Sequence, residues 1–354
     1  MRYELVAKDR STHIKNMVGV LGCTLDFGYY TDLKVSGTLE VDECDYIDGA
    51  MLRIWYEPTL DGETEHICLG TFFVSTMSLE YSYGRYSGTM DISSVLVKYT
   101  KDVCETDTVL AKGRSAKGWW WSAMRWCGAT GTILGDVADV TFSKANIIEF
   151  GKPKLDVLNA IADALGCQVG VTEKGVISLT RYVSPQNRGI AYTMPIGNKS
   201  VTLRGVSYDD GRGDAVNRCV VKFDNAEHSK GTSEPSVIYG KADLDSDSPY
   251  SFARTGVRIT NSYTVDEMSP RTKERADEIA QRYLDMNSKP SATWQMRCLY
   301  LPFTIGDVIR FRYQDSPSDD GIDVDALVSE VSMDIGGTSI VMEVTLKEIR
   351  RRYA

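Results

Sequence analysis

The residues best suited to bind a metal ion lie two positions apart in a predicted strand. His66 and Cys68 would share one face of that strand, and imidazole and thiolate are ligands that Zn²⁺ prefers. The chain holds only two other histidines, His13 and His228, and no H-E-x-x-H or paired-cysteine motif. We therefore expect strand packing at this pair, with no bound metal.

The densest group of carboxylates lies in residues 319–325, which read D-D-G-I-D-V-D. A glycosidase needs two carboxylates that face each other across a cleft, whereas adjacent acids in a glycine-containing loop are usually solvated. The segment lacks the full D-x-D-x-D-G-x-x-x-x-x-E pattern of a calcium loop. Residues 211–214, G-R-G-D, lack the G-x-x-x-x-G-K-[ST] pattern of a phosphate loop. No G-x-S-x-G elbow or Cys-His context stands out, so we predict no catalytic residue, no cofactor and no enzymatic activity.

Four tryptophans, Trp119, Trp120, Trp121 and Trp126, lie in a predicted short helix that Ser115 can cap. Three consecutive helical positions spread over most of the circumference, so at least one indole must face something other than the local core. Aromatic side chains dominate interface burial. We therefore expect the four indoles to divide between the core and a subunit interface. Stacking on sugars, as in a receptor-binding protein, is the alternative.

The elements that would position these side chains are mostly β-strands. Residues 33–41 alternate apolar and polar side chains, the period of a half-buried strand. Further strands are predicted at 51–56, 67–74 and 86–92, with an Asp-Gly turn signal at 61–62 between two of them. Many short strands at this spacing indicate a sandwich or a barrel. We expect residues 1–105 to form an N-terminal β domain of one of these two kinds.

Residues 106–185 are predicted to form a helical connector and a small α+β module. Pro153 precedes a helix and Gly166 follows it, as capping preferences expect. A hairpin with strands at 168–172 and 176–180 comes next. The apolar stripe of the helix consists of Leu155, Leu158, Ile161, Ala162 and Leu165.

Residues 186–354 are predicted to form a second β domain with an inserted loop and helix at about 225–290. Strands are expected at 216–223, 292–300, 308–313, 327–333 and 339–346. Ser269 would cap the inserted helix and Pro270 suits its first position. Its apolar stripe is Ala276, Ile279, Ala280, Tyr283 and Leu284. The basic tail, 347–352, is expected to be a solvated end.

Composition limits the function classes. The chain has 354 residues and a formal charge of −9, which argues against a protein that grips nucleic acid backbones but suits the wall of a passage through which DNA slides. Eight cysteines are scattered singly, so we expect buried, reduced thiols. No stretch is long and apolar enough for a membrane helix, and the N-terminus lacks a signal-peptide pattern. We expect synthesis in a cytoplasm and no membrane insertion.

Two segments carry a resemblance to a known family. The first is the helix and hairpin of residues 154–182, which read L-x-x-L-x-x-I-A and then V-x-x-x-G-x-I. The second is the helix before residue 290 with the strand and loop after it, which end in P-F-T-I-G-D-V-I at 302–309. In that loop Pro302 gives stiffness, Gly306 a tight turn, and Asp307 a side chain that can hydrogen-bond the turn. Together these segments resemble the baseplate hub, or tail-tip hub, family of tailed bacteriophages and related contractile injection systems.

The resemblance implies an α+β, mostly β fold with two tube-like β-barrel domains, residues 1–105 and 186–354, joined by the α+β module and inserted helices. It implies a homotrimer whose six barrel domains form a ring, which continues the tail-tube channel and adapts six-fold symmetry to a three-fold tip. The implied partners are a tail-tube or distal tail protein on one face, a tip, spike or fibre protein on the other, and a tape-measure protein in the lumen. DNA would pass without specific binding.

The same resemblance implies a place in the virion, at the tail tip or baseplate, for a protein made in the cytoplasm of a host bacterium. Longer relatives often carry a trailing lytic domain; we expect none after Arg352, so that any lytic activity would come from another protein. Two other functions remain open at this point. One is a phage-borne cell-wall hydrolase, which would need a pocket with opposed acids or a metal. The other is a carbohydrate-binding receptor protein of the tail, which would need an exposed aromatic platform.

Overall fold

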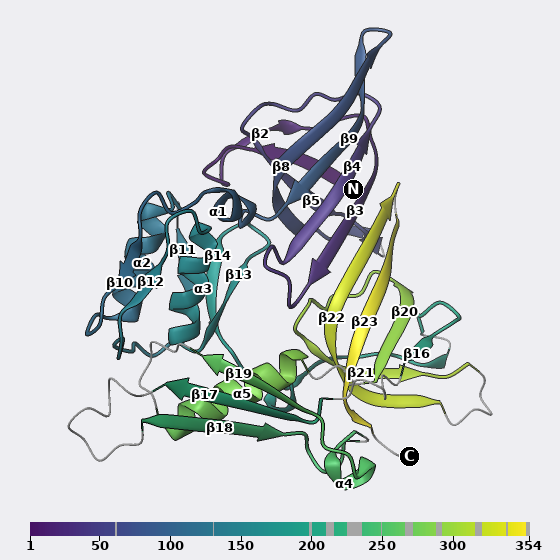
Figure 1. Cartoon of the computed structure of the whole chain (residues 1–354). Helices are drawn as coiled ribbons and strands as arrows, with labels where there is room; N and C mark the ends of the chain where they lie inside the picture. The colour runs from purple at the N-terminus through teal and green to yellow at the C-terminus, as the bar shows by residue number, and fades with distance from the viewer. Residues whose placement is uncertain are drawn as a thin grey trace.

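A single large sheet runs through both β regions of the chain (Figure 1). The computed structural model describes residues 1–60, 62–129, 131–197, 200–209, 216–224, 236–248, 250–265, 272–287, 292–315, 321–337 and 339–351. Within these residues the sheet has 13 strands. Its main path follows the order β16 (Ser207–Asp209), β20 (Thr293–Leu299), β23 (Ser339–Arg351), β22 (Ile322–Gly336), β3 (Val20–Gly28), β4 (Val35–Val41), β9 (Arg85–Ser93), β8 (Ile67–Ser82), β5 (Met51–Tyr56), β1 (Arg2–Val6) and β2 (His13–Asn16). Off this path, β21 (Val308–Tyr313) pairs with β22 and with β15 (Ile190–Thr193).

The pairing of β3 with β22 joins the two β regions. These strands run antiparallel from the pair Gly28 and Glu330 to the pair Gly22 and Gly336. One hydrophobic core lies under the joined strands, with buried side chains such as Leu25 from the first region and Met342 from the second. The sequence predicted two separate barrels, whereas the described strands form one path that ends at β16 and β2 without closing. Alternation along a strand identifies its buried side but not the strand it pairs with.

The α+β module forms a second core beside the first β region (Figure 1). Its helices are α1 (Val97–Lys101), α2 (Ala116–Trp126) and α3 (Lys154–Ala164), and its strands are β10 (Thr108–Leu110), β11 (Thr132–Leu134), β12 (Asn146–Ile148), β13 (Cys167–Val171) and β14 (Ile177–Arg181). The predicted stripe of α3 is buried throughout and the predicted hairpin is β13–β14, so both predictions are confirmed. The sequence did not reveal that β11 adds to β14 in parallel.

The insert forms a third unit with its own core. Its strands are β17 (Arg218–Asp224), β18 (Val237–Asp243) and β19 (Thr260–Val265), and its helices are α4 (Phe252–Thr255) and α5 (Lys273–Asn287). The predicted stripe of α5 packs in this core, whereas Ser269 and Pro270 lie outside the described residues. Strand β17, predicted within the second barrel region, is instead the central strand of the insert sheet. Gly240 of β18 allows this packing, because a Cβ there would lie 2.1 Å from the backbone of Ala276.

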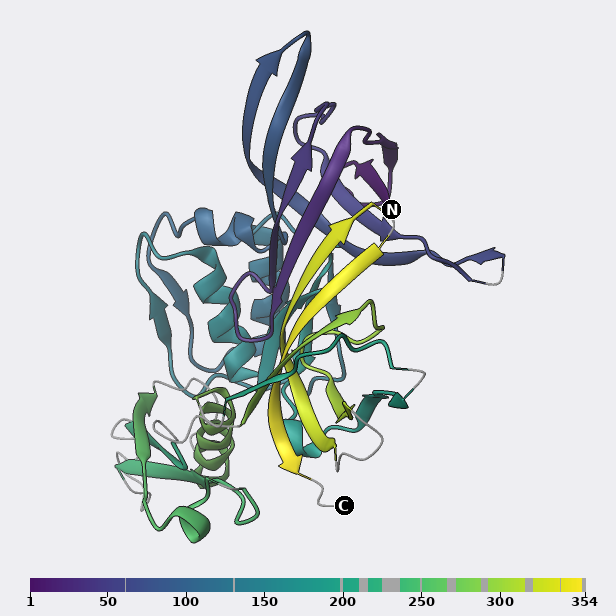
Figure 2. The same cartoon turned by 90° about the vertical axis from the view of Figure 1, so that its right-hand side faces the viewer.

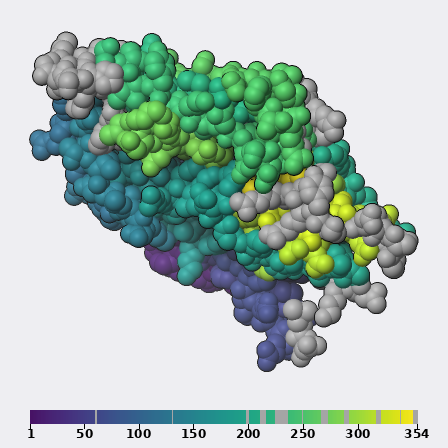
Figure 3. Space-filling model, turned by 90° about the horizontal axis from the view of Figure 1, so that it is seen from below, coloured from purple at the N-terminus to yellow at the C-terminus, as the bar shows by residue number. Residues whose placement is uncertain are grey.

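The insert and the module cover one face of the molecule together. Seen from below, the insert (green) lies beside the module (blue to teal), and the second β region (yellow) is next to it (Figure 3). Short elements complete the described structure: β6 (Thr59–Leu60), β7 (Glu63–Thr64) and the 3₁₀ helix η1 (Pro185–Asn187). Among the described helices, none is long and apolar enough to cross a membrane. All eight cysteines have free thiols, five of them buried and the other three half-buried.

Candidate assembly surfaces

Six neighbouring strands, β20, β23, β22, β3, β4 and β9, present a continuous polar face. Side chains on a strand alternate between its two sides, and the pairing aligns the polar positions of neighbouring strands in rows. In one row Asp26 lies between Ser332 and Ser36, and in the next Asp334, Thr24, Thr38 and Asp91 follow one another. The alternate positions are buried in the large core. We call this surface the polar face; its carboxylates belong to Asp26, Glu40, Asp91, Glu330, Asp334 and Glu343.

The charge on the polar face is mainly negative. Arg297 of β20 forms an ion pair with Glu343 of β23, with 3.1 Å between Nε and Oε1. Lys347 lies at the margin, with its ammonium 4.5 Å from the centre of the Tyr30 ring. Arg85 lies at the outer end of β9. The carboxylates therefore outnumber these cations, and they extend over strands from both β regions.

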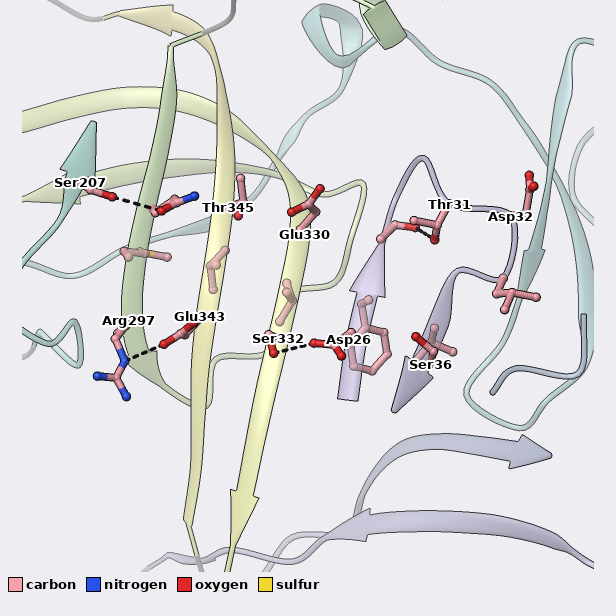
Figure 4. Close-up of a pocket in the computed structure, with 18 of the residues that line it drawn as sticks. Asp26, Thr31, Asp32, Ser36, Ser207, Arg297, Glu330, Ser332, Glu343 and Thr345 are labelled. Atoms are coloured by element: carbon pink, nitrogen blue, oxygen red, sulfur yellow. Dashed lines mark hydrogen bonds and ion pairs between the residues drawn. The ribbon is translucent and has the colours of Figure 1, made fainter. Parts of the chain in front are cut away.

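Part of the polar face is hollowed into a groove of about 670 Å³ (Figure 4). The hydroxyl of Ser332 donates to Asp26 across the β3–β22 pair at 2.6 Å. Glu330 and Glu343 project from the neighbouring strands β22 and β23 on the same side of the sheet. Acids that point the same way from one sheet face differ from the opposed pair that a glycosidase uses.

The loop that resembles the hub family lies at a junction inside the molecule. Gly306 is buried with a φ of +87°, and a Cβ at this position would lie 2.6 Å from the ring of Tyr29. The Asp307 carboxylate accepts hydrogen bonds from the backbone N–H of Thr304 at 2.8 Å and from its hydroxyl at 3.2 Å. Pro302 is exposed at the start of the loop, and β21 begins directly after Asp307. The geometry makes this loop a tight turn that permits close packing.

Arg188 connects this loop to the rest of the chain. Its guanidinium donates to the carbonyl of Gly306 and to the hydroxyl of Tyr29, and it lies 5.1 Å from the centre of the Tyr29 ring. The Tyr29 hydroxyl in turn donates to Gln168 of β13 at 2.9 Å. The loop, the first β region and the module therefore meet at one hydrogen-bonded joint.

The tryptophans of α2 divide between core and surface. Trp120 is fully buried and its Nε1 donates to the Thr132 hydroxyl at 3.3 Å. Trp119 is half-buried against the same core. Trp121 and Trp126 are exposed, and the Lys154 ammonium lies 4.6 Å from the centre of the Trp126 ring. A role in a subunit interface therefore stays a prediction for these exposed indoles.

The candidate zinc pair has separate partners. His66 Nδ1 lies 2.8 Å from Glu57 Oε1, and the Cys68 thiol donates to the carbonyl of Glu173 at 3.5 Å. Burial raises the pKa of Glu57, but hydrogen bonds from Arg2 and His66 outweigh burial and hold the pKa below its ordinary value. In the part of the chain that the structure describes, no three His, Cys, Asp or Glu side chains gather as a metal site.

The acidic segment 319–325 was predicted to be a solvated loop, and for its second half this is wrong. Residues from Ile322 onward belong to β22, because β21 offers a pairing partner. Asp323 forms two hydrogen bonds with the Arg310 guanidinium, at 2.8 and 2.6 Å, and Asp325 is buried. Asp319 and Asp320 lie outside the described residues, as does the G-R-G-D segment 211–214.

A polar contact joins the insert to the module. Asp285 of α5 is buried, and its carboxylate accepts hydrogen bonds from the hydroxyls of Tyr182 at 2.5 Å and Ser184 at 2.9 Å. Burial raises the pKa of the Asp285 carboxyl and outweighs the opposing effect of these hydrogen bonds. On the same helix, Arg282 forms an ion pair with Asp163 of α3, with 3.0 Å between Nη2 and Oδ1. The insert is thus held by buried polar groups as well as by its sequence connections.

Sequence reasoning missed the polar face as a unit. Its residues lie in strands that were predicted, and segments such as E-V-S-M-D at 330–334 show the alternation of acids and hydroxyls with apolar residues. That signal identifies a polar side on each strand. It does not say that polar sides from residues 300 positions apart align, because the β3–β22 pairing is needed for that.

Comparison with known proteins gives a fold. No protein-family model matches the sequence, and no curated protein is similar to it in sequence. A solved tail protein from Neisseria meningitidis is similar in structure, with a TM-score of 0.67, 9% identity, and coverage of 98% of this chain and 96% of that one. A prophage tail protein from Shewanella oneidensis has a TM-score of 0.61 and 12% identity, with coverage of 99% of this chain and 98% of that one. A prophage tail protein from Listeria monocytogenes has a TM-score of 0.56 and 12% identity, with coverage of 99% of this chain and 96% of that one. Across nearly its whole length, the chain has the fold of these tail proteins.

Proposed function

We propose that this protein, whose fold is that of solved tail proteins, is a structural component of a bacteriophage tail and forms its baseplate hub. Two observations support this in addition to the polar face. The fold is shared over 96% or more of both chains in the three comparisons. The loop of Pro302, Gly306 and Asp307, on which the resemblance to hub proteins partly depends, is an internal joint between three parts of the chain.

In this proposal the two β regions act as tube-like domains, and three copies form a ring of six. Such a ring would match a six-fold tail tube on one face and a three-fold tip on the other. The fusion of the regions through β3 and β22 supports the idea, because hydrogen-bonded strands hold two neighbouring domains at a fixed angle. A subunit that spans two positions of a ring needs such a rigid connection.

The observation that carries the proposal is the polar face. Strands from both β regions contribute to it, and its carboxylates are spread over the sheet. DNA binds proteins mainly by exchanging counterions for Lys and Arg contacts with phosphates. A wall with few cations and many carboxylates offers DNA no such exchange. The polar face would therefore line the channel, and DNA would pass without binding.

The proposed partners follow from this arrangement. A tail-tube or distal tail protein would meet one end of the ring, a tip, spike or fibre protein the other, and a tape-measure protein would lie in the lumen. The protein would act in the virion through binding geometry, without catalysis. A receptor function is favoured only by the exposed Trp121 and Trp126, and Lys154 already lies over the second of these rings.

The first test is the mass of the purified protein by light scattering, with negative-stain images of the same fraction. The proposal expects a species of about three times the 39.3 kDa chain mass and particles with a central hole. A monomer at high protein concentration, together with absence of the chain from purified phage particles, would overturn it. A monomer that is nevertheless found in particles would show that the ring assembles on the tail.

A further inference from the structure

Strands β8 and β9 continue past the sheet as a two-stranded ribbon, which projects away from the rest of the molecule (Figures 1 and 2). Strand β5 pairs with β8 only up to Phe73, and β4 pairs with β9 only from Gly88 onward. Beyond these points the two strands pair with each other as far as Ser82 and Arg85, and the Cys44 N–H donates a hydrogen bond to the Tyr86 carbonyl at 2.8 Å. We call residues 76–88 the ribbon.

The two sides of the ribbon differ in chemistry. One side carries Ser78, Glu80 and Ser87 and continues the polar face. The other side carries Met77, Leu79, Tyr81 and Tyr86, and it continues the core side of the sheet, since Met77 lies opposite the fully buried Met90. Leu79 still packs against the large core, but the rest of this side has lost its cover: Met77 is 42%, Tyr81 66% and Tyr86 53% exposed.

The tip of the ribbon carries another aromatic residue where the turn does not favour one. Tyr83 and Gly84 both have positive φ, +51° and +81°. A two-residue hairpin turn of this kind favours Asn or Asp before Gly, and a bulky residue with positive φ is uncommon. Tyr83 is fully exposed. Turn geometry therefore does not account for a tyrosine here.

Single exposed apolar residues are ordinary, but the ribbon combines three features. A two-stranded ribbon is marginally stable alone in water. Its outer edges have no further strand beside them, although the Tyr86 carbonyl accepts a hydrogen bond from Cys44, and its apolar residues form one row. The Tyr81 and Tyr86 rings lie 4.9 Å apart and shield each other only in part. These features together indicate a surface that another protein covers.

The area of the row limits what that protein is. A fully buried aromatic side chain contributes roughly 150–250 Å², so the three partly or fully exposed tyrosines and Met77 offer on the order of 500 Å². A stable interface needs about 800 Å² from each partner. Two ribbons packed on each other would therefore not hold a dimer. A partner that receives several ribbons at once would gain from multivalency.

We propose that the ribbon is the docking element for a different protein of the tail, one that surrounds or abuts the ring and presents a repeated apolar cleft with hydrogen-bond acceptors for the tyrosine hydroxyls. This inference rests on the proposed function, because the ring supplies the several ribbons. The partner lies on the side of the sheet opposite the polar face. The protein thus separates its two contacts, DNA on one side of the wall and a neighbouring protein on the other.

Site-specific photo-crosslinking tests the proposal in intact particles. Tyr83 is replaced by the photoreactive residue p-benzoylphenylalanine, and Glu80, on the polar side of the same ribbon, is replaced in a matched control. Particles assembled with each variant are purified and irradiated, and crosslinked peptides are identified by mass spectrometry. We expect the Tyr83 position to crosslink to a different tail protein, in yield at least about fivefold above the Glu80 position.

Crosslinks to another copy of this chain, to a polysaccharide, or to nothing at all would each overturn the ribbon proposal. Equal crosslinking yields at Tyr83 and Glu80 would overturn it as well, because the partner would then not contact the apolar side in preference to the polar side. If the chain is missing from purified particles altogether, the proposed tail function itself fails. A chain that is present in particles but does not crosslink through Tyr83 leaves the tail function intact and removes only the docking role.

Discussion

Strands β8 and β9 contribute both to the body of the large sheet, which we call the wall, and to the ribbon that projects from it. The two parts differ in what covers their apolar side. On the wall, Val74, Met90 and Ile92 are buried by the chain's own core. On the ribbon, Met77, Tyr81 and Tyr86 continue the same side of the strands without that cover. The alternation of residues is thus the same for a surface that stabilises the fold and for one that is available to a partner.

The contact between insert and module is a third kind. It is covered, like the wall, but the groups that it buries are polar, with Asp285 and Arg282 among them, and Asp285 accepts a hydrogen bond from the half-buried Tyr182. Buried polar groups contribute little net stability and are costly when a partner is removed. We therefore expect the wall to contribute most to the free energy of unfolding, the insert contact less, and the ribbon least.

The largest effect is expected from the covered side of the wall. Leu25→Ala should lower the free energy of unfolding by about 2–5 kcal/mol, because it leaves a cavity in the large core. Leu21→Ala, on the same strand but at an exposed position, should change it by less than about 1 kcal/mol. Urea denaturation of both variants measures the difference. Equal costs would mean that the core under β3 does not hold the two β regions together.

The sequence predicted the two long helices but not the pairing that joins the two β regions. The apolar stripe from Leu155 to Leu165 predicted α3, and the stripe from Ala276 to Leu284 predicted α5. Apolar residues that recur every 3.6 positions, between residues typical of helix ends, indicate an amphipathic helix. The strands were predicted for a similar reason. The β3–β22 pair was not, since its partners lie some 300 residues apart and alternation carries no pairing information.

The candidate surfaces show the same limit. Gly306 and Asp307 were recognised from their residue types, because a turn needs few local contacts. The partners of that loop, Tyr29 and Arg188, carry no local signal and are brought there by the fold. The ribbon was not predicted: the sequence indicated a strand at 67–74, whereas β8 continues to Ser82, with serine and glutamate on one side of the ribbon. Whether its apolar side is covered depends on where the core ends, which no local pattern gives.

The next effect concerns the uncovered polar side of the wall. A triple variant, Glu330→Lys, Asp334→Lys and Glu40→Lys, should create DNA binding, which we expect the natural protein to lack. If each lysine contacts one phosphate, affinity should fall about 40-fold between 50 and 200 mM salt. Filter binding to double-stranded DNA at several salt concentrations measures this.

The matched control reverses Glu63, Glu65 and Glu105, three exposed acids away from the polar face, so the net charge changes equally. We expect this variant to bind at least about tenfold more weakly, since its lysines do not line one surface. Equal binding by the two variants would show that overall charge decides, and that the polar face is no channel wall.

A smaller effect is expected from the insert contact, and it depends on pH. Because burial raises the pKa of Asp285, the folded protein binds this proton more tightly than the unfolded chain does. The stability that this group contributes is therefore present at low pH and is lost as pH rises through the folded pKa. Asp285→Asn cannot titrate, so the unfolding free energy of the natural protein, relative to the variant, should fall from pH 4 to pH 7.

Urea denaturation at pH 4, 5, 6 and 7 measures that slope, and Glu274→Gln provides the control at an exposed position on the same helix. The control should show a flatter difference than Asp285→Asn. A rising difference with pH would mean that the hydrogen bonds from Tyr182 and Ser184 stabilise the charged carboxylate more than burial disfavours it.

The smallest effect on folding is expected from the ribbon. Tyr81→Ser combined with Tyr86→Ser removes one cross-strand aromatic pair, worth about 0.2–1 kcal/mol, and buries nothing new. The free energy of unfolding and the light-scattering mass of the isolated protein should therefore stay close to those of the natural protein. Incorporation of the chain into particles, measured by quantitative mass spectrometry, should drop at least about tenfold. A loss of stability near that of Leu25→Ala would mean that these tyrosines contribute to the core. A loss of incorporation without a loss of stability would mean that the ribbon contributes to assembly and the wall to folding.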